Sequence, residues 1–132
     1  MDKHTFSYEH NKSKVVWDVK DIWEVAESLP VSQLPISNLK SLGDKVFKTY
    51  IEDDYARAEE ADLKYPIIVS DIKVNGNYLI IDGYDRLFKH IQLKHKTIPV
   101  KFISKMPRPL YCKGEPFEIP GLDFDWYDPR KK

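Results

Sequence analysis

Residues 65–103 contain the pattern that most restricts how this chain can fold. Two short apolar runs, residues 66–70 and 77–81, are separated by an Asn-Gly turn signal, and the second ends at Asp82 and Gly83. An amphipathic stretch follows, and residues 97–103 form a last apolar run. Short apolar runs bounded by turn residues indicate strands, whereas spacings of three and four indicate a helix. The pattern predicts strand, strand, helix and strand, with an abrupt turn at Gly83.

The turn at Gly83 is suited to holding an anion. Arg86 follows three residues later, at the start of the expected helix. The first N–H groups of a helix have no partner inside it, so a cation and backbone donors meet at one helix N-terminus. Asp82 is placed to cap the helix, and Asp85 lies in its first turn, where a carboxylate suits the helix dipole.

The same residues resemble the core of the ParB/sulfiredoxin-like superfamily. The resemblance is carried by residues 66–69, by Ile80-Ile-Asp82-Gly83-x-x-Arg86-Leu87 and by residues 98–100, within a region of about residues 29–104. It implies an α+β fold with a small mixed sheet and packed helices. The glycine turn binds nucleotide phosphate in that superfamily, so the resemblance implies a phosphate site, and a nucleoside triphosphate with magnesium is a ligand it allows. The candidate phosphate-binding residues are Gly83, Tyr84, Arg86, Lys89 and His90.

Two departures from the superfamily pattern bear on function. Sulfiredoxin-like relatives have a catalytic cysteine in this turn, where Tyr84 and Asp85 stand here, so sulfinic acid reduction is not expected. Other relatives have histidine or arginine at the position of Asp85. A carboxylate there repels an arriving phosphate, so nucleotide binding is expected to be weakened, metal-dependent or lost. Residues 105–132 are too few for the DNA-reading domain of full-length ParB proteins, which is therefore not expected.

Composition limits the chain to one folded domain. Its 132 residues are 42% hydrophobic and 13% aromatic, which is typical of a globular chain with a single core. There is no apolar run of about 20 residues for a membrane span and no signal-peptide pattern. The single cysteine, Cys112, has no partner for an internal disulfide. We therefore expect a cytoplasmic protein without membrane contact.

The expected organisation has three parts. Residues 1–17 form an N-terminal extension, residues 18–104 the ParB-like domain, and residues 105–132 an extended arm rich in proline and aromatic residues. Helices are predicted over residues 18–29 and 44–61, and a strand over residues 31–36. On the helix after Gly83, an inward stripe is predicted, formed by Tyr84, Leu87, Phe88 and Ile91.

The uneven charge distribution and the C-terminal arm, residues 105–132, each allow two interpretations. Residues 86–113 contain eight Lys or Arg and no acid, and residues 52–62 contain six acids and one arginine. The basic block is either a nucleic-acid-attracting surface or an ordinary solvated face. The arm either wraps its own domain or binds a protein partner, and its candidate partner-binding residues are Phe117, Phe124, Trp126 and Tyr127.

Each candidate site residue also has a structural interpretation. Arg86 either contacts phosphate or pairs with a nearby acid, and Asp85 is a helix-start carboxylate rather than a catalytic base. His90 is expected to be a partly exposed histidine. The four histidines and one cysteine have no metal-ligand spacing, so no metal site is predicted.

Three functions remain. The first is a small ParB-like module, of a kind that would suit a phage or plasmid, that binds a nucleotide or nucleic-acid phosphate in a regulatory or DNA-associated role. The second is a non-enzymatic protein-interaction module on a degenerate ParB-like fold. The third is a nuclease or small-molecule kinase that uses the acids of residues 53–62. Asp85 favours the second over the third, and the intact G-x-x-R favours the first. Catalysis is not expected, and no catalytic residue is assigned.

Overall fold

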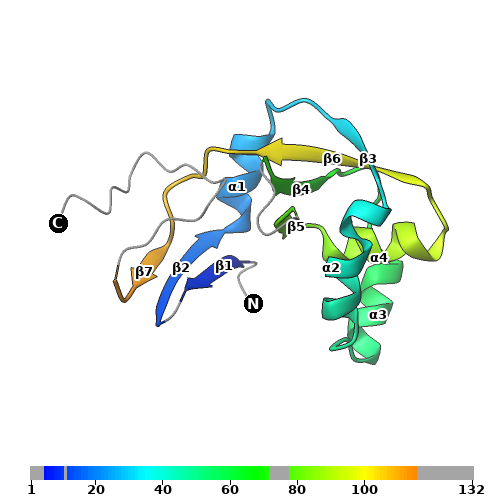
Figure 1. The fold of residues 1–132 in the computed structure, drawn as a ribbon, viewed down its shortest axis with the longest axis horizontal. Coiled ribbons are helices and arrows are strands. Elements are labelled where there is room, and N and C mark those ends of the chain that lie inside the picture. The colour runs from blue at the N-terminus through cyan, green and yellow to red at the C-terminus, as the bar shows by residue number, and fades with distance from the viewer. Residues whose placement is uncertain (1–4, 11, 72–77, 116–132) are drawn as a thin grey trace.

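The structure is a computed structural model, and it describes residues 5–10, 12–71 and 78–115 (Figure 1). Helices and strands are mixed along the chain, so the fold is α+β. In chain order the described elements are β1 (Thr5–His10), β2 (Ser13–Asp18), α1 (Val19–Ala26), β3 (Ser32–Pro35), α2 (Ser37–Phe47), α3 (Glu52–Glu59), β4 (Ile67–Ser70), β5 (Ile80–Asp82), α4 (Tyr84–Gln92), β6 (Thr97–Ile103) and β7 (Tyr111–Lys113).

A four-stranded sheet holds the segment that the sequence singled out. Its strand order is β3-β6-β4-β5, and β4 and β6 run parallel while the other two pairs are antiparallel. Between the parallel strands β4 and β6 the chain passes through β5 and α4. These two elements form the crossover that a parallel pair requires. The predicted strand, strand, helix and strand are therefore confirmed in order and type.

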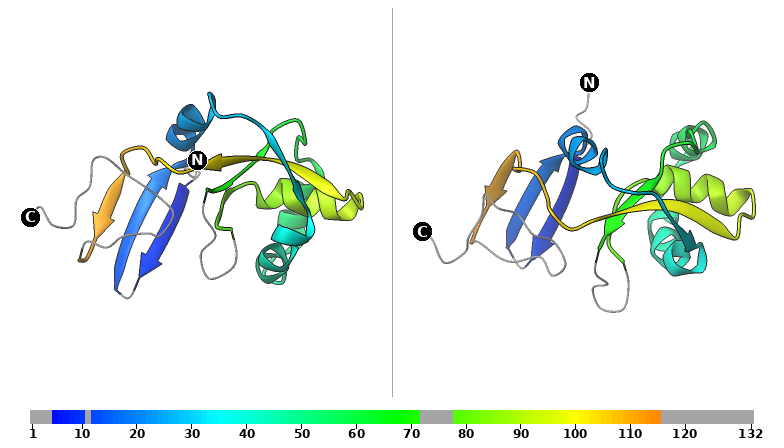
Figure 2. Two further views of the ribbon diagram at one scale, coloured as in Figure 1. Left: turned by 45° about the horizontal axis from the view of Figure 1, so that its top comes forward. Right: turned by 90° about the horizontal axis from the view of Figure 1, so that it is seen from above.

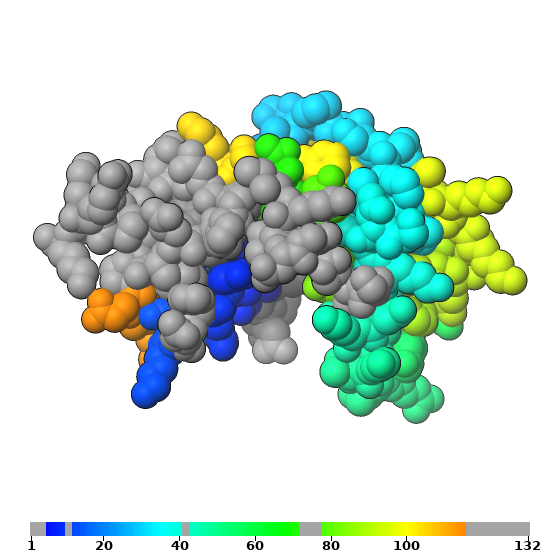
Figure 3. Space-filling view, viewed as in Figure 1, coloured from blue at the N-terminus to red at the C-terminus, as the bar shows by residue number. Residues whose placement is uncertain are grey.

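A second sheet joins the two ends of the described chain. β1 and β2 form an antiparallel hairpin, and β7 pairs with β2 on its other side. Figure 2 shows this sheet at one end of the molecule and α2, α3 and α4 at the other. On the surface view of Figure 3, β7 and α3 are likewise far apart. Strands from the two segments expected to flank the domain, residues 1–17 and 105–132, thus pair in one sheet. Met106, which belongs to the second segment, is buried.

Two hydrophobic clusters lie on opposite faces of the four-stranded sheet. Alternate side chains of a strand point to opposite faces, and the neighbours Ile67 and Ile68 accordingly belong to different clusters. The first cluster packs the hairpin and α1 against the sheet, and its buried members are Val15, Trp17, Ile22, Ala26, Ile68, Ile81, Ile103 and Met106. The second packs α2 and α4 against the sheet, and its buried members are Leu34, Leu39, Phe47, Ile67, Val69, Ile80, Leu87, Ile98 and Val100. The predicted α4 stripe packs in this second cluster.

The helix predicted over residues 44–61 is wrong, because the structure has two helices there. α2 already begins at Ser37 and contains Gly43, and α3 begins only at Glu52. A Cβ on Gly43 would lie 2.8 Å from Leu87 Cδ2, so this glycine lets α2 approach α4 closely. Between the helices, Ile51 has extended backbone, and its N–H donates to the Asp54 carboxylate at 3.0 Å. That bond starts α3 at a point where the apolar spacing of the sequence predicted one uninterrupted helix.

The described part of the arm packs on its own domain, which is the first of the two alternatives that the sequence allowed. Tyr111–Lys113 is a strand, the Leu110 N–H donates to the Val16 carbonyl, and the Trp17 Nε1–H donates to the Pro107 carbonyl at 2.8 Å. Residues 106–113 therefore pack on their own domain. The four partner-binding candidates, Phe117, Phe124, Trp126 and Tyr127, lie outside the described residues, as does the Asn-Gly turn before β5. Within the described residues, the helices are all too short or too polar for a bilayer crossing.

Candidate functional site

The Gly83 turn connects β5 to α4 with a backbone conformation that favours glycine. Gly83 has φ +121° and is the N-cap residue of α4. A Cβ at this position would lie 3.0 Å from Ile67 Cγ1 and 3.1 Å from Arg86 Nη2. The first backbone bond of the helix runs from the Leu87 N–H to the Gly83 carbonyl. The buried glycine therefore places the half-buried start of α4 directly after a buried strand.

Asp82 does not have the predicted capping position, because Gly83 is the N-cap residue. Asp82 is the last residue of β5, and its Oδ2 accepts two bonds, from Arg86 Nη2 at 2.7 Å and from Trp23 Nε1 at 2.7 Å. The side chains of Asp82 and Arg86 are 7% and 12% exposed. The carboxylate therefore fixes both the arginine and the indole beside the turn.

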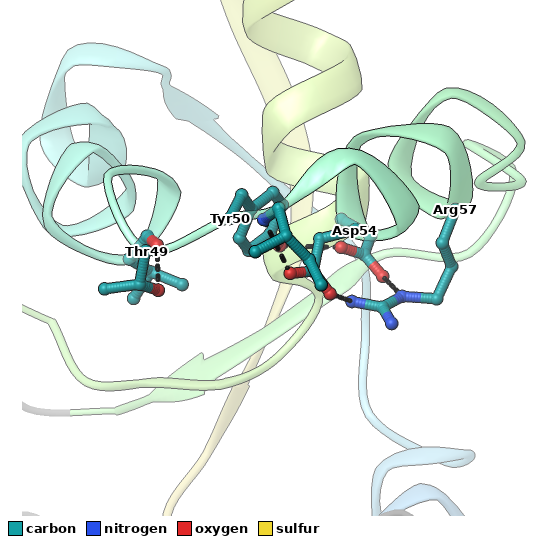
Figure 4. A network of polar contacts seen from close by, with 7 residues as sticks. Thr49, Tyr50, Asp54 and Arg57 are labelled. Carbon is teal, nitrogen blue, oxygen red and sulfur yellow. Dashed lines mark hydrogen bonds and ion pairs between the residues drawn. The ribbon is translucent and has the colours of Figure 1, made fainter.

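Asp85 joins a second network, formed by Tyr50 in the connection between α2 and α3 and by two residues of α3. Its carboxylate accepts from the Tyr50 hydroxyl at 2.6 Å and from Arg57 Nε at 2.8 Å. Arg57 also donates to Asp54 at 3.1 Å, and Figure 4 shows how Tyr50, Asp54 and Arg57 converge. Burial, followed by the bond to Asp85, raises the pKa of Tyr50. Asp85 lies in the first turn of α4 as expected, but an arginine compensates its charge.

A cavity of about 490 Å³ opens in front of the turn. The charged side chains that line it form carboxylate–cation pairs. Its charged lining residues are Arg57, Asp62, Asp82, Asp85 and Arg86, and Asp62 itself lies 3.7 Å from Lys64 Nζ. Its aromatic lining residues are Phe6, Trp23, Tyr50, Tyr65 and Tyr84. A volume of this size suits a small organic ligand, and the lining offers both π-faces and guanidinium donors.

The structure brings together only some of the predicted phosphate-binding residues. Gly83, Tyr84 and Arg86 line the cavity, whereas Lys89 and His90 do not. Lys89 Nζ donates to the Ala61 carbonyl at 2.9 Å. His90 is 4% exposed, so the expectation of a partly exposed histidine is wrong. His90 is one helical turn after Arg86, but His95 in the turn after α4 contacts it.

His90 and His95 form a close pair at the other end of α4. Their Nδ1 atoms are 2.8 Å apart, and the His95 N–H donates to the His90 carbonyl at 3.1 Å. Burial, then the charges of His95 and Arg86, lower the pKa of His90. No described group of three His, Cys, Asp or Glu side chains is arranged to hold a metal ion. Cys112 is exposed, and partial burial raises the pKa of its thiol.

Sequence reasoning missed four residues of the site. Trp23, Tyr50, Arg57 and Tyr65 all line the cavity but lie on other elements. Trp23 falls at helical spacing with Val19 and Ala26, which is typical of a buried face, yet it is 47% exposed. The sequence contains no signal for these four residues, because their exposure and their approach to the turn depend on tertiary packing.

Comparison with protein-family models, with curated proteins and with solved structures found no match to this chain.

Proposed function

We propose that this chain is a small ParB/sulfiredoxin-like module that binds the phosphate of a nucleotide or nucleic acid at the Asp82–Arg86 turn, in a regulatory or DNA-associated role. The observation that carries the proposal is that Gly83 and Arg86 line the same cavity. Gly83 brings the backbone close to a ligand, and Arg86 is held there by Asp82.

Backbone donors support an anion at this position. The N–H groups of residues 84–86 precede the first intrahelical bond of α4, which is donated by Leu87. Such groups point beyond the helix start, where the helix dipole also favours negative charge. Within the described residues, Arg86 donates its one bond through Nη2, and a guanidinium has five N–H donors. Further donors are therefore available to a phosphate.

The ion pair between Arg57 and Asp85 reduces the main objection to phosphate binding. An unpaired Asp85 at the helix start would repel an anion. Arg57 Nε lies 2.8 Å from Asp85, and Tyr50 donates to the same carboxylate, so its charge is compensated. The order strand, D-G-x-x-R turn and helix also supports the superfamily resemblance on which the proposal rests.

Calorimetric titration of ATP, ADP, CTP and GTP, with and without magnesium, tests the proposal. Binding to the wild type that is lost in Arg86→Ala and retained in Arg108→Ala would support it, because Arg108 is an exposed arginine outside the cavity. Circular dichroism of each variant checks folding. Arg57→Ala removes the second arginine of the same cavity, whose side chain is exposed, and tests whether that cation also contributes to binding. Absence of binding to the folded wild type would overturn the proposal.

A second candidate is a non-enzymatic module that binds a protein partner. The observation that favours it is that both cavity arginines already have carboxylate partners. A site in that state needs no ligand to be electrically neutral, and Trp23 and Tyr65 beside it are 47% and 51% exposed. Failure of every nucleotide in the titration would favour this candidate.

A further inference from the structure

An aromatic pair, Trp23 and Tyr65, lies beside the Gly83 turn and lines the same cavity. The rings of Trp23 and Tyr65 are nearly parallel, at 7°, with centroids 6.5 Å apart. They are 47% and 51% exposed, although large aromatic side chains are usually well covered. Two parallel, half-exposed rings present π-faces on which a planar group can stack.

A hydrogen bond holds the indole of Trp23, and a cation lies over the ring of Tyr65. The Trp23 Nε1–H donates to Asp82 Oδ2 at 2.7 Å, which ties the indole to the carboxylate that also holds Arg86. Lys64 Nζ lies 5.2 Å from the centre of the Tyr65 ring. We refer to the rings of Trp23 and Tyr65 as the aromatic platform. A platform that is already ordered loses little conformational freedom when a ligand stacks on it, so the entropic cost of binding is small.

The platform is shared by two cavities. A second cavity of about 450 Å³ adjoins the first, and Trp23, Tyr65 and Arg86 line both. The second cavity adds Pro66 and Ile68 as apolar surface. Its further charged lining residues are Lys20, Lys101, Glu24 and Glu27, and Lys101 donates to the carbonyls of Ala26 and Glu27.

A mononucleotide has one base and needs one such cavity. Two adjoining cavities with a common arginine and a common aromatic platform match a chain of alternating phosphates and bases. We infer that the two cavities form one groove for single-stranded nucleic acid, with a phosphate at the Gly83 turn and consecutive bases stacked on Trp23 and Tyr65. In a duplex the bases are stacked on each other and their faces are inaccessible, so single strands are the chemical class that fits.

The inference rests on the proposed function, because the same turn supplies the phosphate site. Its test is fluorescence anisotropy with labelled oligothymidylates of two, four and eight nucleotides, competed by thymidine monophosphate and by a duplex. The expected result is that an oligonucleotide binds roughly 10- to 100-fold more tightly than the mononucleotide, since each stacked base adds affinity.

A matched pair of variants isolates the platform. Tyr65→Ala should weaken oligonucleotide binding about tenfold or more. Tyr111→Ala should leave it unchanged, because Tyr111 is equally exposed, at 53%, but lies on β7 outside both cavities. Trp23→Phe, which retains a ring, should weaken binding less than Trp23→Ala.

The outcomes distinguish this inference from the proposed function. If mononucleotides bind through Arg86 but oligonucleotides bind no more tightly, the groove is refuted and the phosphate site stands. Equal loss in Tyr65→Ala and Tyr111→Ala, or tighter binding of the duplex, also overturns the groove. If neither mononucleotide nor oligonucleotide binds the folded chain, both proposals fail.

Discussion

Two carboxylates three residues apart in the turn have different structural roles. Asp82 is nearly closed to solvent and fixes Trp23 and Arg86, whereas Asp85 is more open and joins Tyr50 and Arg57. Removal of one partner from a poorly solvated pair leaves the other charge unsatisfied, so such pairs specify geometry strongly. Asp82 therefore orients the groups expected to contact a ligand, and Asp85 holds α4 against the neighbouring helices.

His90 should make the fold less stable in mild acid. Its pKa is lowered by burial and by the charges of His95 and Arg86, while an unfolded histidine titrates at about 6.5. Below that pH the unfolded state binds more protons than the folded state, so stability falls as the pH drops. Urea unfolding at pH values from 7.5 to 5 should show this decrease, and His90→Gln should flatten it. A pH dependence equal to that of the wild type in this variant would contradict the assignment.

The site was predictable only where its residues are local in sequence. The turn between a strand and a helix, Gly83, and a pairing of Arg86 with a nearby acid could be expected, because Asp82 and Arg86 are only four residues apart. The partners Trp23, Tyr50 and Arg57 lie 59, 35 and 28 residues away from the carboxylates they contact. Local spacing holds no information on such contacts, because the packing of helices on the sheet determines them.

At the level of elements, Gly83 makes the junction of β5 and α4 possible. Gly83→Ala should lower the free energy of unfolding by about 1–3 kcal/mol, because alanine is strained at φ +121° and its Cβ would meet Ile67. It should also weaken the nucleotide binding proposed for this turn. Urea unfolding and calorimetry measure the two effects.

Gly114→Ala is the matched control for that change. Gly114 also has positive φ, at +86°, and a Cβ there would meet Ser13, but it lies outside both cavities. This variant should lose stability and keep its ligand affinity. Wild-type stability and affinity in Gly83→Ala would show that the turn does not need glycine.

The elements that sequence reasoning placed correctly are those with strong local signals. β4, α4 and β6 follow from apolar runs and helical spacing, and α1 ends before Pro30 as expected. The break before α3 was missed because Tyr50 continues the helical periodicity, yet its hydroxyl is bonded to Asp85 of another helix. A tertiary contact thus overrode a local pattern. All three strands of the second sheet, β1, β2 and β7, were missed, and β7 is stabilised by pairing with β2, which lies far from it in the sequence.

For the whole molecule, the central strands connect the two hydrophobic clusters. Ile67 and Ile68 are adjacent on β4, and each is buried in a different cluster. Neither cluster can lose its part of β4 without disturbing the other, since the same backbone bonds hold both sides. We therefore expect one cooperative unfolding transition rather than two.

Two alanine substitutions test this coupling. Ile67→Ala and Ile68→Ala should each lower the free energy of unfolding by about 2–5 kcal/mol, because each leaves a cavity in a close-packed cluster. Val31→Ala, at a residue 55% exposed, should change it by less than about 0.5 kcal/mol. Far-ultraviolet circular dichroism follows the helices, of which α2 and α4 pack in the second cluster, and tryptophan fluorescence includes the signal of Trp17 in the first. Both signals should shift together in both variants. If Ile67→Ala moved the dichroism transition and left the fluorescence transition in place, the two clusters would be independent units and the sheet would not couple them.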